Sequence, residues 1–126
     1  MKYNREFLKC EKCGNLVGVV ENAGVSLYCC GAPMTKLVAN TVDASVEKHL
    51  PAVSRADNEL VVTVGEVVHP MTEAHHISWI CVAQDKKTYR AALDVTKEPK
   101  ASFVIDSGDA TVYAYCNLHD LWAIDI

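Results

Sequence analysis

The chain has 126 residues, of which 50% are hydrophobic and 7% aromatic, and its formal net charge is −4. This length fits one ordinary domain, or a domain with a very small companion, and allows a core built mainly from aliphatic side chains. The chain is acidic and has no stretch that interleaves Lys or Arg with aromatic residues, so nucleic acid is excluded as a partner.

The sequence also predicts neither insertion into a membrane nor export through a signal peptide. The longest apolar runs, such as Trp79 to Ala83, fall far short of the roughly 20 residues that span a bilayer. Residues 1–6 are charged, and no apolar segment of signal-peptide length follows them, so we expect a cytoplasmic protein. In a reducing cytoplasm, the six cysteines are expected to bind metal or stay as thiols rather than form disulfides.

The cysteines and histidines divide the chain into two predicted units, residues 1–37 and 38–126. The first holds four of the six cysteines and none of the five histidines. Within it, residues 16–20 and 25–28 are typical of two short strands joined by a turn that ends at Gly24. A unit of this size buries too little surface to fold alone, so a metal would have to hold it together.

The second unit is predicted to be all-β. Residues 38–49 lack periodicity and are expected to form a connector, and beyond them turn-forming residues such as Asp57 and Asn58 separate segments rich in Val, Ile, Tyr and Trp. Strands of this length and spacing favour an immunoglobulin-like antiparallel β-sandwich. The predicted strands are residues 59–64, 76–83, 88–93, 101–105, 110–116 and 121–124. A helical turn at residues 72–76 or 93–97 remains an alternative.

The cysteines of the first unit form two close pairs. Cys10 and Cys13 lie in a C-x2-C-G loop, in which two thiolates can hold one tetrahedral ion while Gly14 permits the tight backbone path around it. The second pair is Cys29 and Cys30. Four soft thiolates select zinc or iron, so we predict a four-thiolate metal site. Neighbouring side chains normally point apart, so this pair reaches one ion only where the backbone bends sharply.

Four of the five histidines lie in or beside short, distinctive strings. A single histidine is more often a surface or core residue than a ligand. The C-x2-H spacing is better evidence, because it lets a thiolate and an imidazole reach one ion from a strand end and the following loop. The strings are Glu47-Lys48-His49-Leu50-Pro51, His69-Pro70-Met71 with His75 after it, and Cys116-Asn117-Leu118-His119.

Together these strings resemble the desulfoferrodoxin family of superoxide reductases over nearly the whole chain. C-x2-C-G followed by C-C-G-x-P-M is similar to the desulforedoxin module, and E-K-H-x-P, H-P-M-x3-H-x-I and C-N-x-H-x2-W follow the order of the neelaredoxin-type domain. The resemblance implies two irons per chain, with zinc as an alternative in the four-cysteine site. It also implies a ferrous centre with four histidines in a plane, one axial cysteine and an open axial position. These implied ligands are His49, His69, His75, His119 and Cys116.

The implied reaction is the one-electron reduction of superoxide to hydrogen peroxide. The resemblance further implies a rubredoxin-like electron donor and a homodimer. Lys48 is expected to attract the anion and to hydrogen-bond to the reduced substrate, and Glu47 to close over the open position once the iron is ferric. The alternative is that Lys48 is an ordinary solvated lysine in a loop, without a role in the reaction.

Three residues stand apart from the family pattern. Asp120 follows the last histidine where the family usually has glycine, and it places a negative charge near the metal. His76 adjoins His75, but alternation along a strand should point it away. Cys81 has no counterpart and is expected to be a small buried hydrophobe.

Three other functions stay open at this stage. The main alternative is a non-catalytic electron-transfer iron protein in which the histidine site is structural. A zinc-stabilised binding module would contain no iron and have no colour. A true dismutase would need no external electron donor.

Overall fold

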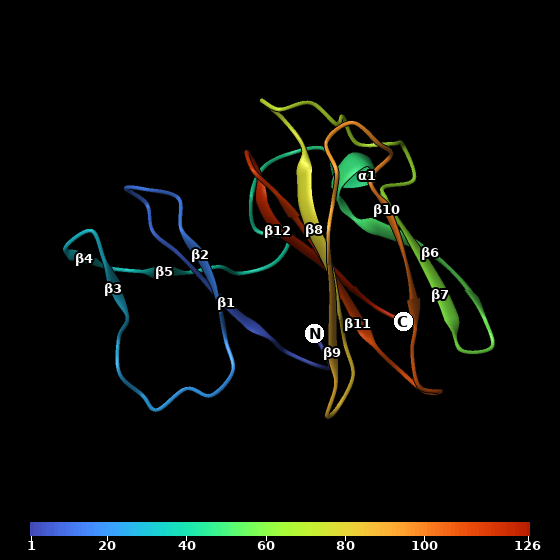
Figure 1. Ribbon diagram of the computed structural model, residues 1–126, viewed down its shortest axis with the longest axis horizontal. Coiled ribbons are helices and arrows are strands. Elements are labelled where there is room, and N and C mark those ends of the chain that lie inside the picture. The colour runs from blue at the N-terminus through green and yellow to red at the C-terminus, as the bar shows by residue number, and fades with distance from the viewer. The chain divides into compact units, whose positions relative to one another are not determined.

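The computed structural model describes residues 1–126 and divides into two compact units. One unit is Asn4–Val38, and the other is Ala39–Ile126 together with Met1–Tyr3. Apart from one helical turn, all regular structure is antiparallel β, which confirms the predicted fold class (Figure 1). No helix is long and apolar enough to cross a membrane.

The unit Asn4–Val38 contains a three-stranded sheet in the order β2-β1-β5 and a two-stranded ladder of β3 and β4. The predicted hairpin of residues 16–20 with 25–28 is wrong, because β2 pairs with β1 and β3 pairs with β4. Pairing with β1 covers the buried Phe7 and Leu8, whereas Val20 and Val25 stay exposed. The strands are β1 Glu6–Lys9, β2 Leu16–Val19, β3 Tyr28–Cys29, β4 Ala32–Pro33 and β5 Thr35–Lys36.

The second unit is the predicted sandwich of two antiparallel sheets. One sheet has the order β10-β7-β6 and the other β12-β11-β8-β9. A short helix, α1 (Val46–His49), lies inside the predicted connector and precedes β6. The strands are β6 Pro51–Ala56, β7 Glu59–Val64, β8 Ile77–Ala83, β9 Thr88–Ala92, β10 Lys100–Val104, β11 Thr111–Cys116 and β12 Asp120–Asp125. Neither suggested helical turn, at 72–76 or 93–97, is present.

The core lies between the two sheets of the sandwich. Strict alternation in β7 turns Leu60, Val62 and Val64 inward, where they join Ile80 of β8 and Val112 of β11 in one apolar cluster. All of these side chains are fully buried. Burying them stabilises the sandwich by roughly 1.5–3 kcal/mol per side chain.

Several strands begin or end beside the loops that carry the histidines and Cys116. β11 ends at Cys116, opposite Ile77 at the start of β8. In the other sheet, β7 ends at Val64, opposite Pro51 at the start of β6. The backbone N–H of Val67 donates to the Glu47 carbonyl over 3.1 Å and so connects the loop after β7 to α1.

Candidate metal centres

Four histidine rings of the sandwich form a closed pinwheel. Neighbouring ring centroids are 4.6 to 5.2 Å apart, and their planes meet at 74° to 89°. The facing rings of His49 and His75 are 6.4 Å apart and tilted by only 32°. Each imidazole is therefore nearly perpendicular to both neighbours, as expected for four donors in a square around one centre. The order around the square is His49, His69, His75 and His119.

The nitrogen atoms of this pinwheel converge. His49 Nε2 lies 3.2 Å from His69 Nε2 and 3.1 Å from His119 Nδ1. Cys116 Sγ lies 3.5 Å from His69 Nε2 and 3.8 Å from His119 Nδ1, and so joins the set from the end of β11. One donor atom each from His49, His75, Cys116 and His119 lies within 4.8 Å of the others.

The chemistry of this donor set fits a bound metal ion. His75 Nε2 is buried and has no hydrogen-bond partner, which is costly unless a cation takes its lone pair. Four imidazole nitrogens and one thiolate are borderline and soft ligands, which suit iron and related transition metals. All five residues implied by the resemblance are therefore brought together.

Carbonyl groups orient two of the imidazoles. His49 Nδ1 lies 2.7 Å from the Ser45 carbonyl, and His69 Nδ1 lies 2.7 Å from the Pro70 carbonyl. A carbonyl only accepts, so each Nδ1 carries the hydrogen and each Nε2 turns a lone pair toward the centre. Trp122 also stacks on His49 at 4.9 Å, and its Nε1 donates to the His119 carbonyl over 3.0 Å.

Burial sets the protonation of the ligands. It lowers the pKa of His49 and His75, and it lowers the pKa of His69 to about 4. These three imidazoles are therefore neutral near pH 7, the form that binds a metal. Burial raises the pKa of the Cys116 thiol, although backbone N–H groups of Leu118 and His119 act in the opposite direction. Cys116 then gives up its proton when a metal binds.

The helix α1 places a cation near the pinwheel. The charge of Lys48 contributes, after burial, to the lowered pKa of both His49 and His75. The Lys48 side chain is partly exposed and Glu47 is exposed. Both side chains are therefore accessible to solvent.

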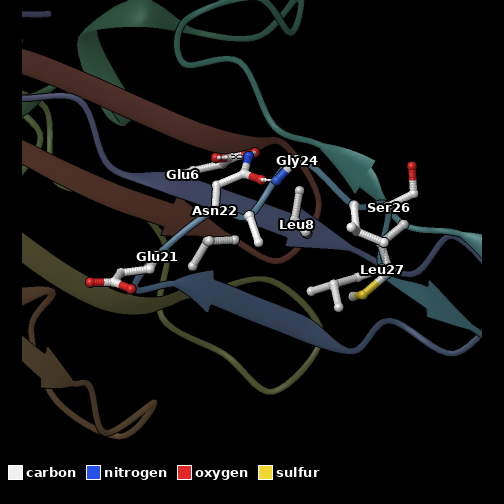
Figure 2. Close-up of a pocket in the computed structure, with 11 residues that line it drawn as sticks. Glu6, Leu8, Glu21, Asn22, Gly24, Ser26 and Leu27 are labelled. Carbon is white, nitrogen blue, oxygen red and sulfur yellow. Dashed lines mark hydrogen bonds between the residues drawn. The ribbon is translucent and has the colours of Figure 1, made fainter.

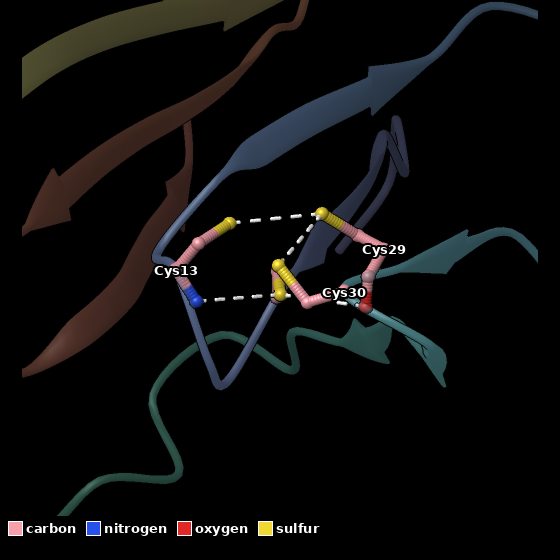
Figure 3. Close-up of side chains that lie close together, drawn as sticks. Cys13, Cys29 and Cys30 are labelled. Carbon is pink, nitrogen blue, oxygen red and sulfur yellow. Dashed lines mark hydrogen bonds between the residues drawn. The ribbon is translucent and has the colours of Figure 1, made fainter.

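The second cluster is the four cysteines of the unit Asn4–Val38, whose sulfur atoms all lie within 4.8 Å of one another. Figure 3 shows the side chains of Cys13, Cys29 and Cys30 turned toward one another. Cys13 Sγ lies 3.6 Å from Cys29 Sγ, which lies 3.9 Å from Cys30 Sγ. The fourth thiol, Cys10, is buried and accepts from the Cys13 backbone N–H over 3.5 Å.

The sharp bend expected between the adjacent cysteines is present. Cys30 has a φ of 53° and Gly31 a φ of 75°, both in the left-handed region. Backbone N–H donation from Cys13 lowers the pKa of Cys10 to about 6, whereas sharing a hydrogen bond with Cys13 raises the pKa of Cys30 to about 12. The cluster therefore tolerates one thiolate more easily than four, and a cation is needed to hold all four as thiolates.

His76 and Cys81, which were singled out in the sequence, lie outside the pinwheel and make other contacts. His76 turns its Nδ1 toward the carbonyls of Thr72 and Glu73, at 2.9 and 3.1 Å. Cys81 is buried in β8, as expected. The contacts of Trp122 with His49 and His119 were missed in the sequence, although this tryptophan belongs to the motif that carries the resemblance.

Comparison with known proteins gives one consistent family. The desulfoferrodoxin family model matches residues 41–125, and the model of the desulfoferrodoxin N-terminal domain matches residues 3–37. The desulfoferrodoxin of Syntrophotalea carbinolica is 45% identical over 118 residues, which cover 94% of each chain.

Solved structures extend the likeness to the fold. The superoxide reductase from Treponema pallidum superposes with a TM-score of 0.77 at 33% identity and covers 96% of this chain and 98% of its own. The superoxide reductase from Giardia intestinalis has a TM-score of 0.56 at 29% identity and covers 64% of this chain but 97% of its own. Part of this chain thus has no counterpart in the Giardia protein.

Proposed function

Because this chain belongs to the desulfoferrodoxin family, we propose that it is a superoxide reductase. The reaction adds one electron and two protons to superoxide and releases hydrogen peroxide. The observation that carries the proposal is the pinwheel of four imidazoles with the Cys116 thiol beside it. Superoxide reductases of Treponema pallidum and Giardia intestinalis support it by their similar folds.

We assign five ligands to the catalytic centre: His49, His69, His75, His119 and Cys116. Ferrous iron bound there would supply the single electron. Imidazoles bind a metal in their neutral form, so they would leave the positive charge of the centre in place to attract an anion. Cys116 would be the one anionic ligand, and its thiolate would supply electron density that favours reduction of the bound substrate. Water supplies the two protons.

Lys48 and Glu47 are the proposed catalytic side chains beyond the ligands. The Lys48 ammonium attracts superoxide to a chain with a net charge of −4 and donates a hydrogen bond to the reduced product. Its effect on the pKa of His49 and His75 supports a position close to the centre. The exposed carboxylate of Glu47 would close over the site once the electron has been transferred.

We propose a second iron in the four-cysteine cluster, which gives two irons per chain. Zinc is the alternative there, because four thiolates accept both metals. Both clusters need reduced thiols, which supports a cytoplasmic location. The electron donor is proposed to be a small rubredoxin-like protein.

A homodimer is the proposed assembly. In the unit Asn4–Val38, the exposed fractions of Val20 and Val25 are 99% and 79%, and an open pocket of about 430 Å³ lies beside Val25 and Leu27 (Figure 2). Apolar side chains this exposed are favourable for burial against a second copy. Light scattering should give the mass of two chains, and the mass of one would refute the dimer.

The decisive experiment measures stoichiometry. Reduced protein with a renewable electron donor is exposed to a steady superoxide flux, and peroxide and oxygen are counted. One peroxide per superoxide, with no oxygen, is the expected result. One peroxide and one oxygen for every two superoxides would mean dismutation. No acceleration over buffer would leave electron transfer or a structural metal site.

A further inference from the structure

His75 differs from the other Nε2 donors in how it is held. His49 and His69 each have a carbonyl 2.7 Å from Nδ1, which fixes the orientation of the ring. The hydrogen bonds of His75 are made by its backbone to Thr72, and its ring Nε2 is buried without a partner. His75 precedes β8 in the loop after His69, so its position depends on how that loop is anchored.

Asn117 holds this loop on both sides of His75. Its Oδ1 accepts from the His76 backbone N–H over 2.8 Å, and its Nδ2 donates to the Ala74 carbonyl over 3.0 Å. The Asn117 backbone N–H also donates to the His76 carbonyl over 3.1 Å. The side-chain amide of Asn117 therefore bonds to the residues immediately before and after His75, the proposed ligand.

The other end of this bridge belongs to the same centre. Asn117 directly follows Cys116 and lies two residues before His119. Its hydrogen bonds therefore join the segment with two proposed ligands to the segment with a third. Thr72 closes the turn around His75 through its hydroxyl, which accepts from the His75 N–H over 3.0 Å. That bond fixes the shape of the turn, whereas Asn117 fixes where the turn lies.

We propose that Asn117 is the positioning residue of the catalytic centre, which sets the place of His75 relative to Cys116 and His119. This inference rests on the proposed ligand role of His75. Asn117 is not one of the proposed ligands, and its side-chain amide bonds to the backbone of Ala74 and His76. Partners that orient ligands commonly change metal affinity by about 10–100-fold when they are removed.

The test compares Asn117→Ala with a matched variant, Gln84→Ala. Gln84 makes the same kind of amide pair, donating to the Asp106 carbonyl over 2.8 Å and accepting from the Asp106 N–H over 3.1 Å. It lies just beyond β8, whereas His75 precedes that strand. Asn117→Ala loses two side-chain hydrogen bonds to backbone, and Gln84→Ala loses three, the third to the Asp109 carbonyl at 3.4 Å. The control is therefore expected to loosen the fold at least as much as Asn117→Ala.

Two readouts are measured on iron-loaded protein: the rate of iron release to a chelator, and the position of the thiolate-to-iron absorption band. Asn117→Ala is expected to release the histidine-bound iron at least about tenfold faster and to shift the band. Gln84→Ala should match the wild type in both. Wild-type behaviour of Asn117→Ala, or equal changes in both variants, would overturn the inference.

Asn117→Asp provides a second variant in case Asn117→Ala does not fold. It keeps the acceptor for the His76 N–H and loses the donor to the Ala74 carbonyl. Its added negative charge attracts the iron and opposes release, so release is compared at high ionic strength, where this attraction is screened. Faster release there would identify the lost hydrogen bond, and release no faster than wild type would contradict the proposal. These readouts need no superoxide, so they stand apart from the stoichiometry that tests the proposed function.

Discussion

Gly65 lies so close to Glu47 that a Cβ atom added to it would stand 2.6 Å from the Glu47 carbonyl oxygen. The same atom would lie 2.8 Å from the Leu50 carbonyl. The absence of a side chain at position 65 thus allows α1 to pack against the loop after β7. Since α1 carries Lys48 and His49, this close approach helps to place both the proposed steering cation and a proposed ligand.

The substitution Gly65→Ala should push α1 away from this loop. Overpacking against rigid backbone costs about 1–3 kcal/mol of unfolding free energy, which urea titration would measure. Iron in the histidine centre should fall as His49 moves. Gly18→Ala is the control, since its Cβ would meet Phe7 at an ordinary 3.7 Å. Full iron content in Gly65→Ala would show that His49 keeps its place, and it would contradict the prediction.

Lys48→Ala should slow the second-order reaction with superoxide. Loss of one local positive charge is expected to reduce the rate about tenfold at low salt and to weaken its dependence on ionic strength, because steering is electrostatic. Pulse radiolysis over a range of salt concentrations measures both. Lys87→Ala removes the same net charge from a lysine paired with Asp106 and should leave the rate unchanged. An equal loss in both variants would point to net charge rather than position.

Cys116→Ser should abolish the thiolate-to-iron absorption of the catalytic centre and its superoxide turnover. A serine hydroxyl stays protonated at neutral pH and cannot replace the axial thiolate. Cys81→Ala is the matched control, because Cys81 is also a buried cysteine of the same sheet. Absorption spectra and metal analysis of the reoxidised proteins show whether the thiolate-to-iron absorption is lost. Retained colour and turnover in Cys116→Ser would place the axial ligand elsewhere.

Cys13→Ser should remove the four-cysteine centre and leave superoxide reduction in place. The sandwich has its own buried core, whereas the unit Asn4–Val38 has few buried side chains, so we expect this unit to depend on a bound metal. Hydrogen exchange is therefore expected to become fast in β1 to β5 and to stay slow in β7, β8 and β11. If turnover with the electron donor falls with the four-cysteine iron, that centre relays electrons.

The sequence predicted the central strands of the sandwich but missed β6. Its residues, Pro51–Ala56, follow no clear apolar alternation, because β6 lies at the edge of its sheet and half of its side chains meet solvent. Proline is tolerated there because it is the first residue of the strand. The hairpin error in the first unit has a similar cause. The pairing of strands as short as β3 and β4 is determined by the cysteine cluster rather than by the pattern of their own residues.

The candidate site was predicted more completely than the fold around it. Its proposed ligands lie in short strings that resemble those of the desulfoferrodoxin family, so each string could be matched on its own. The roles of Gly65 and Asn117 depend on approach between segments far apart in the chain, such as Asn117 to Ala74. No local pattern encodes such contacts.

Asp120 gives a final prediction that separates charge from backbone strain. It lies opposite Cys116 in the β11–β12 register, has a φ of 60°, and its carboxylate adds to burial in raising the pKa of Cys116. A negative charge here stabilises ferric over ferrous iron, so Asp120→Asn should raise the midpoint potential of the catalytic centre. Asparagine tolerates the left-handed region, so the fold should be unaffected.

Asp120→Gly should raise the midpoint potential in the same way. Glycine relieves left-handed strain but also gives the unfolded chain more freedom, so the unfolding free energy should change by less than about 1 kcal/mol. Asp85→Asn, in the exposed β8–β9 turn, is the charge control and should leave the potential unchanged. Spectroelectrochemical titration measures all three. A shift in Asp120→Gly but not in Asp120→Asn would assign the effect to backbone geometry instead of the carboxylate charge.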